Sequence, residues 1–145
     1  MGPTGPTGGL LQTAFAGITT VVLAVGGTSV LTGGPISMTP GSTTDKISML
    51  GNGYVFTGTT STNGQLTVSM LVDGSIVTEQ ILQIPPGFTG FSNAGVAFSM
   101  GWQATGLTGG TAHTFDLKAG AIGATGATVT MVSQSGGLLL TRSSV

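Results

Sequence analysis

Residues 65–84 of this 145-residue chain read QLTVSMLVDGSIVTEQILQI, and this stretch decides the fold. In its first half, the polar residues Gln65, Thr67 and Ser69 point one way, and the apolar Leu66, Val68, Met70 and Val72 point the other. A period of two is that of a β-strand with one buried face. Asp73-Gly74 then separates the two halves, and Asp-Gly is a strong hairpin signal because both central residues of such a turn need a positive φ. The stretch predicts an antiparallel hairpin.

Similar short apolar runs follow one another along the chain, cut by glycine, proline or asparagine. Gly51-Asn52-Gly53 is interpreted as the turn of a second hairpin, between 46–50 and 54–60. The run 10–25 is interpreted as one doubly buried strand, with a helix as the alternative. The other expected strands are 36–38, 96–105, 111–119, 128–133 and 138–141. With roughly eight to ten strands and no convincing helix, the sequence predicts an all-β, two-sheet antiparallel jelly roll.

The composition excludes several classes of function. Only 5% of the residues are charged and the net charge is −1, against about 25% charged residues in a typical domain. Such a chain has no field that attracts nucleic acid or an acidic membrane. With 39% hydrophobic residues, it also fits the disordered class poorly. A neutral, hydroxyl-rich surface of this kind suits a packed assembly better than a free monomer.

The chain has no cysteine, which excludes disulfides and thiolate chemistry. The apolar run 14–25 is shorter than the roughly 20 residues that span a bilayer. No Lys or Arg precedes Lys46, so this run lacks the basic segment of a secretory signal. We expect neither a membrane segment nor a signal peptide of its own.

Few residues could perform catalysis. His113 shares its expected strand face with Phe115 and Leu117, so a core or interface imidazole is favoured over a catalytic one. A metal shared by three copies of His113 is the alternative. No calcium loop or phosphate-binding loop is present. We expect no enzyme activity, no cofactor and no metal.

The aromatic residues have two possible roles. Trp102 lies on the alternating face of 96–105 and is expected in the core. Phe88 and Phe91 lie in a glycine-rich loop, where they could contact a ligand together with Tyr54 or pack beneath the loop. The residues expected to pack between sheets or between subunits are Val96, Phe98, Met100, Trp102, Phe115, Leu138 and Leu140.

The first eight residues, MGPTGPTG, have glycine at every third position with proline after it. This is the pattern of collagen, in which three chains meet and only glycine fits at the axis. Two triplets are too few to hold a triple helix alone, but they predict a trimer. The residues of this stem are Gly2, Pro3, Gly5, Pro6 and Gly8. We divide the chain into a stem, 1–9, and a head domain, 10–145.

A Gly-Pro-Thr stem before an all-β head resembles collagen-like surface proteins with a trimeric TNF/C1q-like jelly-roll head. Gly53-Tyr54-Val55-Phe56 is similar to the Gly-x-Tyr-x-Phe stretch of C1q-like domains, and 71–77 resembles the hairpin that follows it. The end, 136–142, is similar to the closing strand beside the subunit axis. The segment 106–117 resembles one in small β-rich phage virion proteins.

The resemblance implies a homotrimeric, non-enzymatic structural protein on the surface of a tailed-phage virion, as a capsid decoration or a fibre tip. Its partners would be itself and a capsid or other virion protein. One alternative is a head that binds carbohydrate or a host receptor. Another is a collagen-like protein of a bacterial spore or cell surface.

Overall fold

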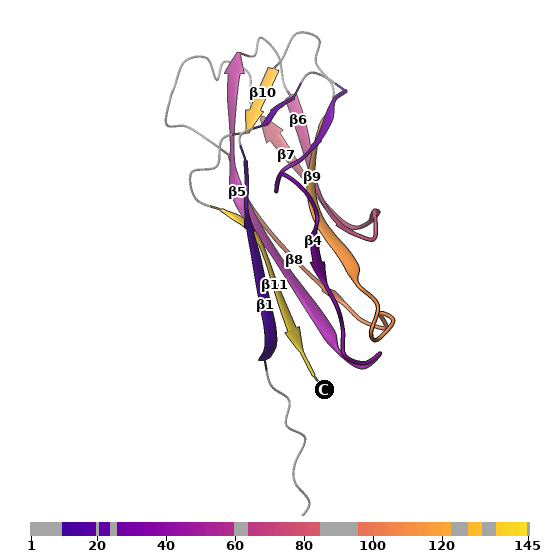
Figure 1. Cartoon of the computed structure of the whole chain (residues 1–145). Coiled ribbons are helices and arrows are strands. Elements are labelled where there is room, and N and C mark those ends of the chain that lie inside the picture. Colours follow the sequence, from indigo (N-terminus) through magenta and orange to yellow (C-terminus); the bar gives the residue numbers. More distant parts are fainter. Residues whose placement is uncertain are drawn as a thin grey trace, which may run out of the picture.

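The chain was analysed as a computed structural model that describes residues 10–19, 21–23, 26–59, 64–84, 96–122, 128–131 and 136–144 (Figure 1). Within these ranges the structure is all-β without a helix, in two antiparallel sheets, consistent with a jelly-roll-like β sandwich. The strands are β1 (Leu10–Gly17), β2 (Val21–Leu23), β3 (Thr28–Val30), β4 (Ile36–Met38), β5 (Lys46–Thr59), β6 (Gly64–Val72), β7 (Ser75–Ile84), β8 (Val96–Ala104), β9 (His113–Ile122), β10 (Thr128–Met131) and β11 (Gly137–Ser143). It follows that none of the described segments is a helix capable of crossing a membrane.

The first sheet has the order β1-β11-β5-β10-β2, and β8 pairs with residues 47–55 of β5, on the edge opposite β11. The last described strand, β11, therefore lies inside the sheet, between β1 and β5. The register pairs Leu10 with Ser143, so the beginning of β1 and the end of β11 lie together at the lower end of Figure 1.

The second sheet has the order β3-β9-β6-β7, and β4 also pairs with β9. The hairpin of β6 and β7 confirms the prediction from residues 65–84, because two residues connect the strands. Asp73 and Gly74 have φ values of 49° and 78°, as a two-residue turn of this kind requires.

The hydrophobic core lies between the two sheets. The first sheet contributes Ile47, Met49, Phe98, Leu138 and Leu140, and the second contributes Leu66, Val68, Met70, Phe115 and Leu117. Each of these is at most 3% exposed. Burial of a large aliphatic or aromatic side chain contributes about 1.5–3 kcal/mol, so this layer holds the sheets together.

The predicted hairpin at Gly51-Asn52-Gly53 is wrong, because β5 runs through these residues without a turn. Both glycines face the second sheet. A Cβ on Gly51 would lie 2.9 Å from Cε of Met70, and one on Gly53 would lie 2.8 Å from Cε1 of Phe98. Here glycine provides room for close packing of side chains instead of a turn.

The run 10–25, expected to be one strand, contains two, β1 and β2. They pair with different partners, β1 with β11 and β2 with β10. Between them the backbone N–H of Ile18 donates to Gly136, and that of Thr19 donates to Leu31. These bonds lead the chain away from β11 towards the second sheet.

Candidate interaction surface

The outer surface of the first sheet carries a row of exposed apolar side chains. Directly opposite residues in an antiparallel pair lie on the same face of the sheet. Phe15 pairs with Leu139, which pairs with Leu50, which pairs with Gly101, so these four residues form one row across β1, β11, β5 and β8. Phe15 is 65% exposed and Leu50 is 47% exposed. Met49 and Leu140, the next residues along β5 and β11, are buried, so the row of Phe15 and Leu50 points away from the core.

On the same outer side of the sheet, the next row in each direction lies two residues away along every strand. Both of these rows contain only glycine and uncharged polar residues. One contains Thr13, Thr141, Ser48 and Gln103, and the other contains Gly17, Gly137, Asn52 and Ser99. We call this surface of three rows the neutral face. On the described residues of these four strands, Lys46 at the lower end is the one charged residue on this side of the sheet. The other six charged residues lie in loops, in the second sheet or, as Arg142, on the inner side of β11.

Trp102 differs from the expectation of a core residue, since 43% of it is exposed. Its row contains Met49 and Leu140, both buried, so the indole does lie on the inner side of the sheet. However, β8 is bonded to no described strand beyond β5, and β7 is bonded to none beyond β6. Within the described part of the chain these two are therefore edge strands, and no further described strand continues the first sheet beside the indole.

The other residues expected in a core or interface divide into two groups. Phe98, Met100, Phe115, Leu138 and Leu140 are buried between the sheets of a single chain, and Val96 is half-buried. They therefore contribute to the inter-sheet core and not to the outer surface. Tyr54 is on the outer side of β5 and 46% exposed. Phe88, Phe91 and the stem lie outside the described residues.

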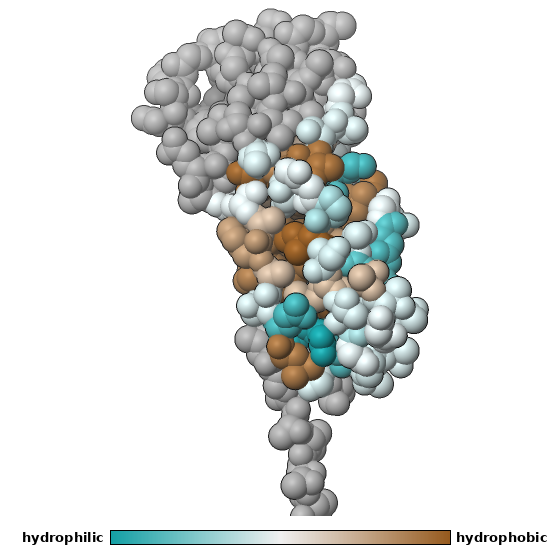
Figure 2. Space-filling view, in the orientation of Figure 1, coloured by the Kyte–Doolittle hydropathy of each residue, from teal (hydrophilic) through white to brown (hydrophobic). Residues whose placement is uncertain are grey.

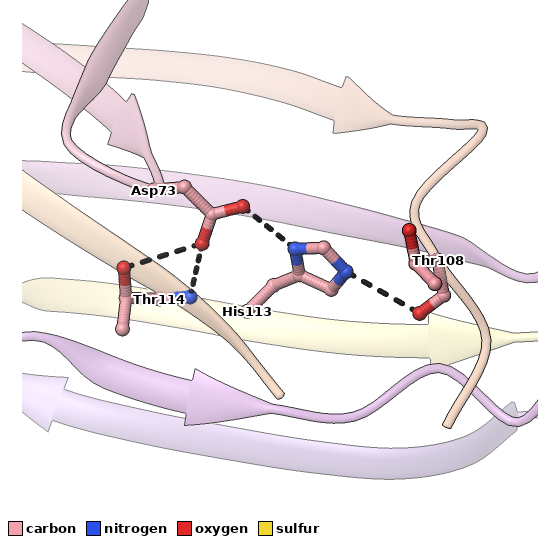
Figure 3. A network of polar contacts seen from close by, with 4 residues as sticks. All are labelled: Asp73, Thr108, His113 and Thr114. Carbon is pink, nitrogen blue, oxygen red and sulfur yellow. Dashed lines mark hydrogen bonds and ion pairs between the residues drawn. The ribbon is translucent and has the colours of Figure 1, made fainter. Parts of the chain in front are cut away.

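His113, the first residue of β9, is held in a polar network with the β6–β7 turn and the loop before β9 (Figure 3). Its Nδ1 lies 2.6 Å from Oδ2 of Asp73, and its Nε2 lies 3.3 Å from the carbonyl oxygen of Thr108. Asp73 also accepts from the backbone N–H of Thr114 at 2.8 Å. The hydrogen bond from His113, followed by that from Thr114, lowers the pKa of Asp73 below its ordinary value.

This network resembles a catalytic triad only in its first two members. In a triad the imidazole faces a hydroxyl or thiol that becomes the nucleophile. Here the second ring nitrogen faces a main-chain carbonyl, which has no proton to give up. The arrangement joins the β6–β7 turn to the loop before β9, and it provides no nucleophile.

A second network lies in the loop before β5. Asp45, which is 5% exposed, accepts from the backbone N–H of Gly41 at 2.7 Å and from Oγ of Ser42 at 3.0 Å. Nε of Arg142 lies 2.9 Å from the same carboxylate, as an ion pair without the alignment of a hydrogen bond. The pKa of Asp45 lies below its ordinary value, mainly because of the hydrogen bond from Gly41. Ser42 and Arg142 act in the same direction, and desolvation partly opposes them.

In the two networks, Asp73 and His113 contact each other, and so do Asp45 and Arg142. Figure 2 shows hydrophilic residues, in teal, towards the lower end and the right-hand side of its view, and brown or pale residues over much of the rest. Among the residues that the structure describes, no three His, Cys, Asp or Glu side chains come close enough to bind a metal ion together.

No protein-family model matches this chain, and no curated protein matches it either.

Proposed function

We propose that this chain is the homotrimeric, non-enzymatic head of a TNF/C1q-like jelly-roll protein on the surface of a tailed-phage virion, where it decorates the capsid or tips a fibre. The observation that carries the proposal is the neutral face. Exposed Phe15 and Leu50 lie there among hydroxyl and glycine residues, with a charged residue only at the end. A second copy could cover such a surface without removing a charge from water.

The edge of the sandwich gives the neutral face a complementary partner. Trp102 leaves an indole partly exposed between β8 and β7. When two different patches of identical chains bind each other, the contact is heterologous, and it closes into a ring if the rotation allows. Contact between the neutral face of one copy and the Trp102 edge of the next therefore favours a ring over a two-fold dimer.

The stem sets the expected number of copies at three. Its Gly-Pro-Thr triplets are of the kind that packs three chains around one axis. Residue 9 is followed directly by Leu10, the first residue of β1, which belongs to the sheet with the neutral face. Three copies meeting through that face would bring their stems together.

The strand order supports the TNF/C1q-like interpretation. The resemblance implies that the closing strand lies beside the subunit axis. In this chain β11 lies inside the first sheet, and Leu139 on it belongs to the central row of the neutral face.

The mass of the protein in solution tests the trimer. We expect light scattering at micromolar concentration to give about 43 kDa, three times the 14.2 kDa of one chain. A stable monomer would overturn the proposal.

The location is tested separately, with labelled antibodies on whole particles. We expect label on the capsid or tail tip of virions. Label confined to spores or bacterial cells would move the same trimeric head to the alternative, a collagen-like surface protein of bacteria.

A second candidate function is a head that binds carbohydrate or a host receptor. The observation that favours it is Tyr54, a residue that is 46% exposed and that lines a cavity beside β5 and β8.

A further inference from the structure

The cavity beside Tyr54 has a volume of about 350 Å³. Ligand pockets start at about 300 Å³, so the cavity is large enough for one small molecule and too small for a long polymer. Its lining comes from β5, β8 and the residue before β11, namely Asn52, Gly53, Tyr54, Ala97, Phe98 and Gly136.

The cavity lies where strand pairing along β5 changes. β11 pairs with β5 as far as Asn52, and β10 pairs with it from Phe56 onwards. Between these points, in the described ladder, β5 is bonded only to β8. The cavity therefore opens where the described pairing of β5 passes from one strand to the next.

The side chains at this position combine an aromatic ring with a carboxamide. Tyr54 presents an apolar ring and a polar hydroxyl. The carboxamide of Asn52 is held in place because its Oδ1 accepts from the backbone N–H of Gly137 at 3.2 Å. A fixed polar group beside an exposed ring provides both orientation and contact area for a ligand.

The surroundings contain no charge. All seven charged residues and His113 belong to the described part of the chain, so the undescribed loops add none. The nearest charged residues along the sheet are Lys46 on β5 and Arg142, which pairs with Ile47. Five residues separate Ile47 from Asn52, which is about 17 Å along a strand. A phosphate, sulfate or carboxylate would find no counter-ion here.

We propose that this cavity binds one neutral sugar unit, with the ring of Tyr54 against the sugar and with the carboxamide of Asn52 bonded to its hydroxyls. A neutral sugar has C–H groups on its ring faces and hydroxyls at its rim, which matches an aromatic ring beside fixed polar groups. The inference names the ligand class of the second candidate function and rests on that function, but it does not depend on the trimer. Leu50 and Tyr54 are four residues apart, about 13 Å, so the cavity adjoins the upper row of the neutral face at Asn52 but lies away from its central row.

The experiment uses the full chain and saturation-transfer NMR with glucose, galactose, N-acetylglucosamine and, as an acidic probe, glucuronate. We expect at least one neutral sugar to receive saturation and glucuronate to receive none. Tyr54→Ala should weaken binding of the neutral sugar at least tenfold, and Tyr54→Phe, which keeps the ring, should weaken it less. Ile81→Ala, on the second sheet, is the control and should bind as the unaltered chain does.

Two results would overturn the inference. One is that none of the neutral sugars binds; the other is that the Tyr54→Ala protein, shown to be folded by circular dichroism, binds as tightly as the unaltered chain. The mass is measured in the same samples. A trimer that binds no sugar removes this inference alone, and a monomer that binds sugar removes the trimer alone.

Discussion

Replacing Leu50 by aspartate tests the neutral face directly. Full burial of a leucine side chain contributes about 1.5–3 kcal/mol. Leu50 is still 47% exposed in one chain, so assembly would gain roughly 1 kcal/mol from it in each subunit. An unpaired carboxylate in a closed contact costs several kcal/mol more. We therefore expect Leu50→Asp to weaken association by about 3 kcal/mol or more per subunit, which is over a hundredfold.

The assay is light scattering of the folded variant at micromolar concentration, with circular dichroism to show that the sheets are intact. The expected result is a trimer for the unaltered chain and a monomer for Leu50→Asp. Ile81→Asp is the matched control, because Ile81 is 54% exposed but lies in the second sheet. A trimer that survives Leu50→Asp refutes the reasoning. The reasoning is also refuted if both variants dissociate to the same extent, because the loss of the trimer would then not depend on the neutral face.

Three further outcomes concern stability. In a urea titration, Gly53→Ala should lower the free energy of unfolding by about 1–3 kcal/mol, because its Cβ would lie 2.8 Å from Phe98. The control is Gly101→Ala, whose Cβ would come no closer than 3.6 Å to another atom, and it should change the free energy of unfolding by less than about 0.5 kcal/mol. Leu117→Ala should cost about 2–5 kcal/mol in that assay, because Leu117 is fully buried. Asp73 has a folded pKa below its ordinary value of 3.8, so its contribution is complete above that value and is lost as pH falls through the folded pKa. Asparagine tolerates the same turn, so Asp73→Asn should fold and its thermal melting should depend less on pH below about 4. The difference in the free energy of unfolding should be no more than about 1 kcal/mol, because Asp73 is half exposed.

The hairpin of β6 and β7 could be predicted because its signals are local. The alternation from Leu66 to Val72 depends only on neighbouring residues, and the turn depends on the backbone conformations that Asp73 and Gly74 tolerate. No distant part of the chain competes with either signal. The all-β, two-sheet character follows from several such segments.

Glycine is ambiguous in a sequence because it serves two purposes. At Gly74 it permits a positive φ of 78°. At Gly51 and Gly53 it permits side chains of the opposite sheet or of a neighbouring strand to approach the backbone of β5. Only the position of Met70, Ile18 and similar neighbours distinguishes the two uses, and those contacts come from other parts of the chain.

The site residues also depend on contacts between distant parts of the chain, which the sequence alone does not show. The alternation along β8 places Trp102 on the inner side of the sheet correctly, but it contains no information about which strand is the last in the sheet. The bond between Asp73 and His113 joins residues 40 positions apart. A sequence shows that both residues exist, and only the pairing of β6 with β9 brings them together.

The distribution of charge connects the stability of the fold with its assembly. Four of the titratable residues make contacts that fix loops, namely Asp45 with Arg142 and Asp73 with His113. With seven charged residues in all, little charge remains to keep the rest of the surface hydrated. Phe15 and Leu50 then expose apolar area on a face whose one charged residue, Lys46, lies at its end. A second copy on that face would remove apolar area from water, which would lower the free energy. The trimer proposed above would cover this face and leave the contacts of Asp45 and Asp73 within each chain unchanged.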